Sequence, residues 1–158
     1  MRGKDKVIAT LNLALRSELQ SINQYFLHGE MCENWGYHRI GKIIKKQSID
    51  EMKHAESLIE RILFLDGAPN LGMGINIKAG TSVKEQLEAD LALELEAFAQ
   101  YNAAVKTCLE EGDNTSRELF AKLLQDEEKH IDFLEAELNV IQEAGVENYL
   151  IAQTEEED

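Results

Sequence analysis

Apolar residues recur every three or four positions in four long stretches of this chain, with short polar breaks between them. That spacing places the apolar side chains on one face of an α-helix. Ser82-x-x-Glu85 and Thr115-x-x-Glu118 have the form of capping boxes and mark two helix starts. The pattern predicts helices over about residues 4–34, 37–66, 82–111 and 115–144, and a short fifth helix over 146–153.

The link from Asp66 to Thr81 is the longest break in this pattern, and it holds the only proline and four of the ten glycines. Sixteen extended residues reach about 50 Å at roughly 3.3 Å each, which exceeds the length of a helix of about 28 residues. The link can therefore run the whole length of a bundle, whereas the short links make antiparallel hairpins. We predict one all-α domain over 1–158, a four-helix bundle of two antiparallel hairpins with a long crossover and a short C-terminal helix.

Two copies of one motif stand at a constant offset in these helices. Each copy is a lone Glu followed 33 residues later by Glu-x-x-His, and corresponding members are 76 positions apart. All members fall within the apolar stripes, near the middle of their helices, so they are expected to face the core. The two sets are Glu18, Glu51 and His54, and Glu94, Glu127 and His130.

This residue set has the chemistry of a dinuclear metal site. Four ionised carboxylates in a dry core would each cost several kcal/mol unless positive charge compensated them. Two divalent cations would balance them, and mixed carboxylate and imidazole ligands suit iron, manganese or zinc. A structural zinc site is disfavoured because the set contains no thiolate. The alternative, salt-bridged surface glutamates and two ordinary core histidines, would explain one copy better than it explains two.

Composition narrows the class of partner and the compartment. The net charge of −14 disfavours nucleic acid, whose phosphates would be repelled. No apolar stretch is long enough to span a membrane, and the N-terminus lacks a signal-peptide core, so we expect a cytoplasmic protein. Cys32 and Cys108 are expected to be free thiols at opposite ends of the bundle. The acidic run 155–158 is expected to be a frayed, solvated tail.

Several runs of residues resemble the bacterioferritins over nearly the whole chain. The pairing of a lone Glu with a Glu-x-x-His motif is also the pattern of ferritin-like di-iron proteins. The resemblance implies a ferritin-like fold and a cage of 24 subunits built from twofold dimers. It also implies a ferroxidase that oxidises Fe(II) with dioxygen or peroxide and stores the Fe(III) mineral. The runs are Asn23–His28, Ser48–Ala55, Leu58–Leu65, Glu127–Asp132 and Glu147–Leu150.

The same resemblance implies a role for each candidate residue, with two iron ions in each subunit. The terminal ligands would be Glu18 and Glu94, the bridging ligands Glu51 and Glu127, and the remaining ligands His54 and His130. Tyr25 matches a tyrosine beside the site, and a plain core aromatic is an equally weighted interpretation of it. We expect no further tyrosine or tryptophan beside the ligands.

Met52 follows Glu51 and is turned from it by about 100° of helix rotation, so it should point out of the bundle. In the bacterioferritins the matching methionine pairs with its copy across a twofold axis, and the two sulfurs ligate one haem iron. Spacing alone would favour an ordinary apolar dimer interface with methionine as a gap-filler. The resemblance instead favours haem b shared between two subunits, beside an apolar surface that includes Leu19, Ile22, Phe26, Ile49 and Ile59.

Other functions stand as alternatives to iron storage. A di-iron enzyme acting on an organic substrate would need a substrate pocket, for which a filled bundle of 158 residues leaves little room. A peroxide-reducing rubrerythrin-like protein would need CxxC pairs, which this chain lacks. A non-catalytic helical assembly protein would keep the site residues without using them. An electron-donating ferredoxin is a further partner that the resemblance implies.

Overall fold

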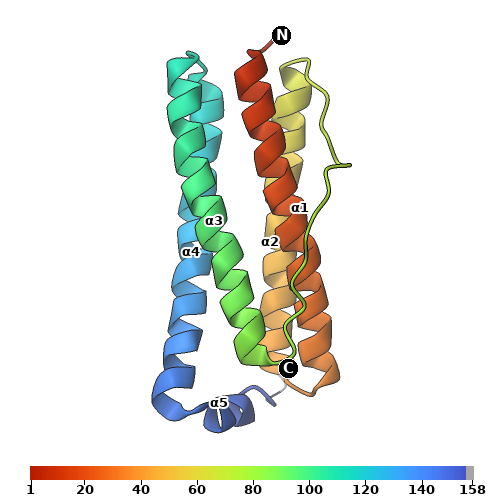
Figure 1. Cartoon of the computed structure of the whole chain (residues 1–158), viewed down its shortest axis with the longest axis vertical. Helices are drawn as coiled ribbons and strands as arrows, with labels where there is room; N and C mark the ends of the chain where they lie inside the picture. The colour runs from red at the N-terminus through yellow and green to blue at the C-terminus, as the bar shows by residue number, and fades with distance from the viewer. Residues whose placement is uncertain (156–158) are drawn as a thin grey trace.

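The computed structural model describes residues 1–155, and within them the chain forms five α-helices and no strand. α1 and α2 form one antiparallel hairpin, α3 and α4 form the second, and α1 packs against α3 (Figure 1). The predicted four-helix bundle with a short fifth helix is confirmed, and residues 156–158 of the acidic run lie outside the described residues. The helices are α1 (Asp5–Asn34), α2 (His38–Phe64), α3 (Val83–Glu110), α4 (Asn114–Ala144) and α5 (Val146–Ala152).

Two apolar clusters fill the bundle, one toward each end, and leave a polar layer between them. Leu11, Leu58 and Phe120 belong to the cluster at the end where α1 begins. Ile44 and Leu134 belong to the cluster at the other end. Because a helix places residues three and four apart on one face, the same stripe that builds both clusters also carries the polar layer.

α2 ends at Phe64, two residues before the predicted end. Asp66 adopts a left-handed conformation with φ of 58°, which a helix cannot continue through. The N–H of Asp66 donates to the carbonyl of Leu63, and the N–H of Gly67 donates to that of Ile62 at 2.9 Å. These two bonds close the helix as a Schellman motif, in which aspartate takes the position that glycine usually occupies.

The two predicted capping boxes have different outcomes. Ser82 is the N-cap of α3 and accepts from the N–H of Glu85, whose carboxylate accepts in turn from Thr81. The predicted start of α4 at Thr115 is wrong, since Asp113 is its N-cap and accepts from the N–H of Ser116 at 2.9 Å. A short carboxylate competes well for this position, and that of Asp113 also pairs with Arg61 of α2.

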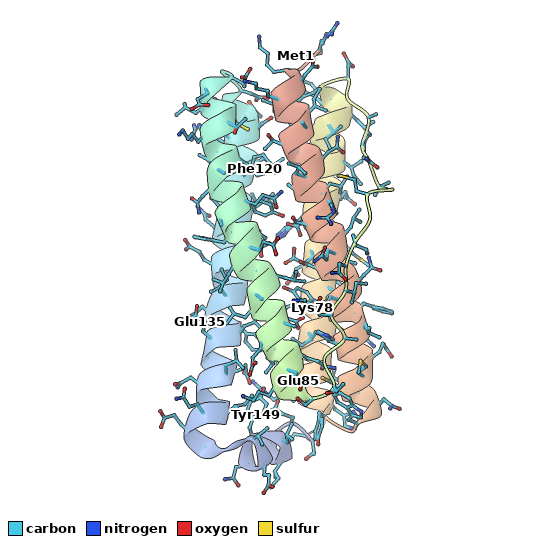
Figure 2. All side chains as sticks on the ribbon, viewed as in Figure 1. Met1, Lys78, Glu85, Phe120, Glu135 and Tyr149 are labelled. Carbon is cyan, nitrogen blue, oxygen red and sulfur yellow. The ribbon has the colours of Figure 1, made fainter. Side chains whose placement is uncertain are left out.

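The crossover between α2 and α3 runs down the outside of α1 over its whole length (Figure 1). A row of polar side chains spaced four residues apart on α1 holds its backbone. Four helical residues rise about 6 Å and two extended residues span about 6.6 Å, so the two spacings match. From Arg16 onward the hydrogen-bonded crossover residues are Gly74, Asn76, Lys78 and Gly80, and Lys78 is marked in Figure 2. The α1 row is Asn12, Arg16, Gln20, Gln24 and His28.

Two expectations from composition can also be compared with the structure. Cys32 and Cys108 are free of a disulfide, as predicted, and the structure shows in addition that both are buried. Within residues 1–155, no helix combines the length and the apolar character that crossing a bilayer requires.

Candidate metal centre

All four long helices contribute to the polar layer at the middle of the bundle. α1 and α3 each bring one glutamate, whereas α2 and α4 each bring a glutamate and, one turn later, a histidine. The four carboxylates are 1% exposed and the two imidazoles 8% exposed. The predicted ligands that meet here are Glu18, Glu51, His54, Glu94, Glu127 and His130.

These residues form two overlapping groups, each with ligand atoms within 4.8 Å of one another. Glu51 and Glu127 belong to both groups, so they lie between two positions that could each hold an ion. The ring centroids of His54 and His130 are 6.4 Å apart. One group adds Glu18 and His54 to the shared pair, and the other adds Glu94 and His130.

Several buried atoms of the centre have no hydrogen-bond partner. The Nδ1 atom of His130 lies 2.9 Å from Glu51 Oε1, yet it makes no hydrogen bond there. Buried polar atoms are nearly always paired, and unpaired carboxylate oxygens in a dry core are especially costly. The atoms therefore fit a site whose missing partners are cations. Several of the carboxylate atoms without a hydrogen-bond partner lie within 4.0 Å of an imidazole Nδ1. These carboxylate atoms are Glu18 Oε2, Glu51 Oε1, Glu94 Oε2 and both oxygens of Glu127.

Protons take the place of cations when the centre is metal-free. Burial alone lowers the pKa of His54, but hydrogen bonds and negative charge from Glu18 and Glu51 outweigh it and raise the pKa to about 11. Burial likewise lowers the pKa of His130, and Glu51 and Glu94 raise it to about 10. Burial raises the pKa of Glu18 and of Glu94. The metal-free centre therefore holds protons that metal ions would displace.

A tyrosine donates a hydrogen bond to each of the two unshared carboxylates. Tyr25 of α1 donates to Oε1 of Glu94, and Tyr101 of α3 donates to Oε1 of Glu18 at 2.6 Å. Burial raises the pKa of both phenols, so both stay protonated donors. The expectation of no further tyrosine beside the ligands is wrong. Tyr101 is 76 positions after Tyr25, so the repeat already contained the signal.

Each imidazole also faces an aspartate from the opposite hairpin. Nε2 of His54 lies 3.0 Å from Asp126, and Nε2 of His130 lies 3.7 Å from Asp50. The two aspartates are again 76 positions apart, and sequence reasoning did not link them to the histidines. Since Nδ1 of each ring faces the glutamates, an Nε2–H···carboxylate contact would leave Nδ1 free to bind metal.

A pocket of about 430 Å³ opens beside both histidines, between α2 and α4. Asp50 and Asp126 line it, as do Ser57 and lysines from both helices. Ser57 corresponds through the repeat to Phe133, a partly buried aromatic that packs into the core at the other end. The two hairpins therefore line the pocket alike at the aspartates and histidines, and they differ at Ser57, whose counterpart is Phe133.

A buried pair of ionisable groups lies behind Tyr25, toward the crossover. His28 Nδ1 lies 2.8 Å from Oδ1 of Asp90, and both side chains are fully buried. Gln24 donates to the same carboxylate oxygen at 2.9 Å, and the other ring nitrogen of His28 lies 2.8 Å from the carbonyl of Lys78. The pair thus joins α1, α3 and the crossover.

Met52 lies on the outside of the bundle, although its neighbour Glu51 is in the core. Its side chain is 48% exposed, and Phe26 and Ile49 are exposed to similar degrees. Leu19 and Ile22, which the sequence predicted to belong to the same surface, are partly buried. An exposed apolar surface that includes a thioether fits a flat apolar group or a second subunit better than it fits water.

Comparison with known proteins agrees with the helical pattern and the residue set. The family described as "Ferritin-like domain" matches residues 8–144. The chain is 47% identical over 149 residues to a protein of Brucella melitensis named "Bacterioferritin", covering 94% of this chain and 92% of that protein. Proteins with the same name from Mycolicibacterium paratuberculosis and Rhodobacter capsulatus are 44% and 42% identical, each with 94% of its length covered.

Proposed function

The chain belongs to the bacterioferritins within the ferritin-like family, and from this premise we propose that it stores iron and is a ferroxidase. One observation carries the proposal. Two groups of buried carboxylates and imidazoles overlap at Glu51 and Glu127, and several of their oxygen atoms have no hydrogen-bond partner. Two Fe(II) ions are the substrate that would satisfy these atoms and balance four carboxylates.

The residues of the centre divide the work between them. Glu18 with His54, and Glu94 with His130, would each bind one ion, while Glu51 and Glu127 would hold the two ions together. Two Fe(II) ions supply two electrons at once, which suffice to reduce dioxygen to hydrogen peroxide or hydrogen peroxide to water. The burial of the centre limits the access of bulk water and of other reductants to the oxidant.

The pocket beside the histidines is the route that we assign to iron. It reaches from solvent to the outer edge of both imidazoles, and the carboxylates of Asp50 and Asp126 lie along it. Carboxylates attract hydrated divalent cations, and these two lie next to the histidines, whereas lysines of both helices line the rest of the pocket.

The apolar surface around Met52 is the place that we assign to haem b, shared between two subunits. A thioether is a known ligand of haem iron, and haem would supply an electron-transfer group at that surface. Met52 would bind the iron, while Phe26 and Ile49 would cover the ring faces and edges. From membership of the bacterioferritins we further propose a cage of 24 subunits built from twofold dimers, located in the cytoplasm and reduced by a ferredoxin.

Ferroxidation is tested by adding two Fe(II) per subunit to the purified protein and following oxidant consumption. Wild-type protein should consume the oxidant rapidly. Glu51→Ala removes a ligand shared by both groups and should largely abolish this rapid consumption. Glu56→Ala on the same helix is the matched control, because Glu56 is exposed and belongs to neither ligand group. A wild-type rate in the Glu51 variant would exclude this centre as the site of oxidation.

Assembly and haem are tested on the same preparation. Native mass measurement should give a particle of several hundred kilodaltons, and a monomer or dimer would contradict the cage. Met52→Leu keeps the apolar surface but removes the sulfur, so the red-shifted Soret band should disappear. Persistence of that band in the variant would show that another residue ligates the haem.

A further inference from the structure

Tyr101 is bonded to the metal centre although it lies in the apolar cluster at one end of the bundle. Its side chain is fully buried, and its hydroxyl donates to Oε1 of Glu18 at 2.6 Å. Tyr25 makes the equivalent bond to Glu94 from the opposite direction. Each hairpin therefore supplies a phenol to the unshared glutamate of the other hairpin.

The bond leaves Glu18 with one free oxygen. Oε2 has no hydrogen-bond partner and lies 3.6 Å from Nδ1 of His54, on the side of the centre. Without a donor at Oε1, the carboxylate could rotate about its last bond and exchange its two oxygens. The phenol thus selects which oxygen of Glu18 is offered to an ion.

The tyrosine ring is itself held in place. It packs on Phe120 of α4 with ring centroids 5.7 Å apart, and Ala14 and Ala104 lie in the same cluster. A closely packed ring places its hydroxyl with little freedom, because cores are filled at near-crystalline density. Replacing tyrosine by phenylalanine would keep this packing and remove only the donor.

We propose that Tyr101 is a positioning residue of the metal centre, which holds Glu18 for the ion that it shares with His54. The proposal rests on the proposed function and adds a residue that acts on one of the two ion positions. Groups that orient metal ligands typically contribute about 10–100-fold to metal affinity. Loss of the phenol should therefore weaken the position formed by Glu18 and His54 and spare the position formed by Glu94 and His130.

The experiment measures Co²⁺ binding to the metal-free assembled protein by the visible absorbance of the bound ion. His130→Ala leaves the group of Glu18 and His54 intact, and His54→Ala leaves the other group intact. In the His130→Ala protein, Tyr101→Phe should lower Co²⁺ affinity by about 10–100-fold and change the absorption spectrum. In the His54→Ala protein, the same substitution should change the affinity by less than about threefold.

Tyr25→Phe is the matched control, because it removes the same group from the other glutamate. It should show the opposite pattern in the two backgrounds. Equal losses in both backgrounds, or no loss in either, would overturn the role of Tyr101, and so would a spectrum unchanged by Tyr101→Phe. Thermal unfolding of the metal-free variants checks that the fold is kept.

A second measurement separates this inference from the proposed function. Wild-type protein should bind two Co²⁺ ions per subunit, and failure to do so would contradict the centre itself. If wild type binds two ions, Tyr101→Phe in that background should weaken one of the two binding events. Two unchanged events would contradict only the role of Tyr101.

Discussion

Tyr25 and Tyr101 make the same hydrogen bond in the two halves of the molecule, but the residues behind them differ. Behind Tyr25 lies the buried pair of His28 and Asp90. The repeat places Ala104 and Ala14 at the corresponding positions, and both are buried among apolar side chains. The halves are therefore alike at the metal ligands and their tyrosines, and they differ in the residues behind those tyrosines.

The difference follows from the crossover, which passes only one side of the bundle. The crossover's backbone must be satisfied where it leaves water, and His28 and Gln24 do this at Lys78. Within residues 1–155 no comparable segment crosses the other half, and alanines fill that space. The two halves keep the same residues where each of two ions would need the same ligands. They differ where only one half contacts the long crossover between α2 and α3.

The largest expected effect is a pH dependence that the two halves share. The raised pKa values of His54 and His130 stabilise the metal-free fold fully below about 6.5, and this stability is lost as pH rises through about 10 and 11. The loss is at most about 1.4 kcal/mol per pH unit for each imidazole. Glu18 and Glu94 act in the same direction, since their pKa values are also raised.

The thermal midpoint of the metal-free protein should therefore fall steadily from pH 7 to about 10, as scanning calorimetry can show. Protein loaded with Zn²⁺ should keep its midpoint over this range, because cations replace the protons. Replacing both histidines by glutamine should flatten the dependence. A midpoint of the metal-free wild type that does not change with pH would contradict the protonated imidazoles.

The next largest effect concerns the buried pair of His28 and Asp90, which has no counterpart behind Tyr101. His28→Ala leaves the carboxylate of Asp90 buried without its imidazole, and breaking such a pair typically costs roughly 3–5 kcal/mol. Adding Asp90→Ala reproduces the two alanines of the other half, so the double variant should lose less than the two single losses added together. Denaturant unfolding of the three metal-free variants measures this. A loss near the roughly 0.5 kcal/mol of a surface substitution would contradict the pairing.

The smallest effect concerns the pocket beside the histidines, at the position where its lining differs between the two hairpins. Ser57→Phe gives the first hairpin the residue that the second hairpin has at Phe133, and the ring should occupy part of the pocket. Iron oxidation should slow a few-fold while stability changes by less than about 0.5 kcal/mol. Stopped-flow absorbance checks the rate, with Ser57→Ala as the control. An unchanged rate in the Phe variant would place the route of iron elsewhere.

The sequence predicted the parts of this molecule that repeat along the chain. Helix periodicity predicted the bundle, and the offset of 76 predicted that Glu18 and Glu94 would meet at one level. The same offset relates Tyr25 to Tyr101 and Asp50 to Asp126, yet these pairs were not recognised. Their role depends on contacts between hairpins, which periodicity within one helix does not contain.

Local competition explains the remaining errors. Asp113 rather than Thr115 caps α4, because its carboxylate also reaches Arg61 from another helix. α2 ends early because Asp66 accepts a left-handed conformation that its residue type only sometimes adopts. The polar row on α1 has the spacing of a solvent-exposed helix face, although its side chains hydrogen-bond to the backbone of the crossover. In the sequence, the contact with the crossover is indicated by polar residues four positions apart on a helix of the hairpin that precedes a long link.

Because the crossover is held to α1 in steps of two residues, its length has little freedom to change. Surface connections usually tolerate insertions, since the entropy of closing a loop grows slowly with its length. One extra residue before Gly74 would shift every later backbone group by about 3.3 Å and turn its N–H to the other side. Gln24 and His28 would then lose their partners. Related chains that keep this row should vary in length at the hairpin turns near Gly36 and Gly112 rather than in the crossover.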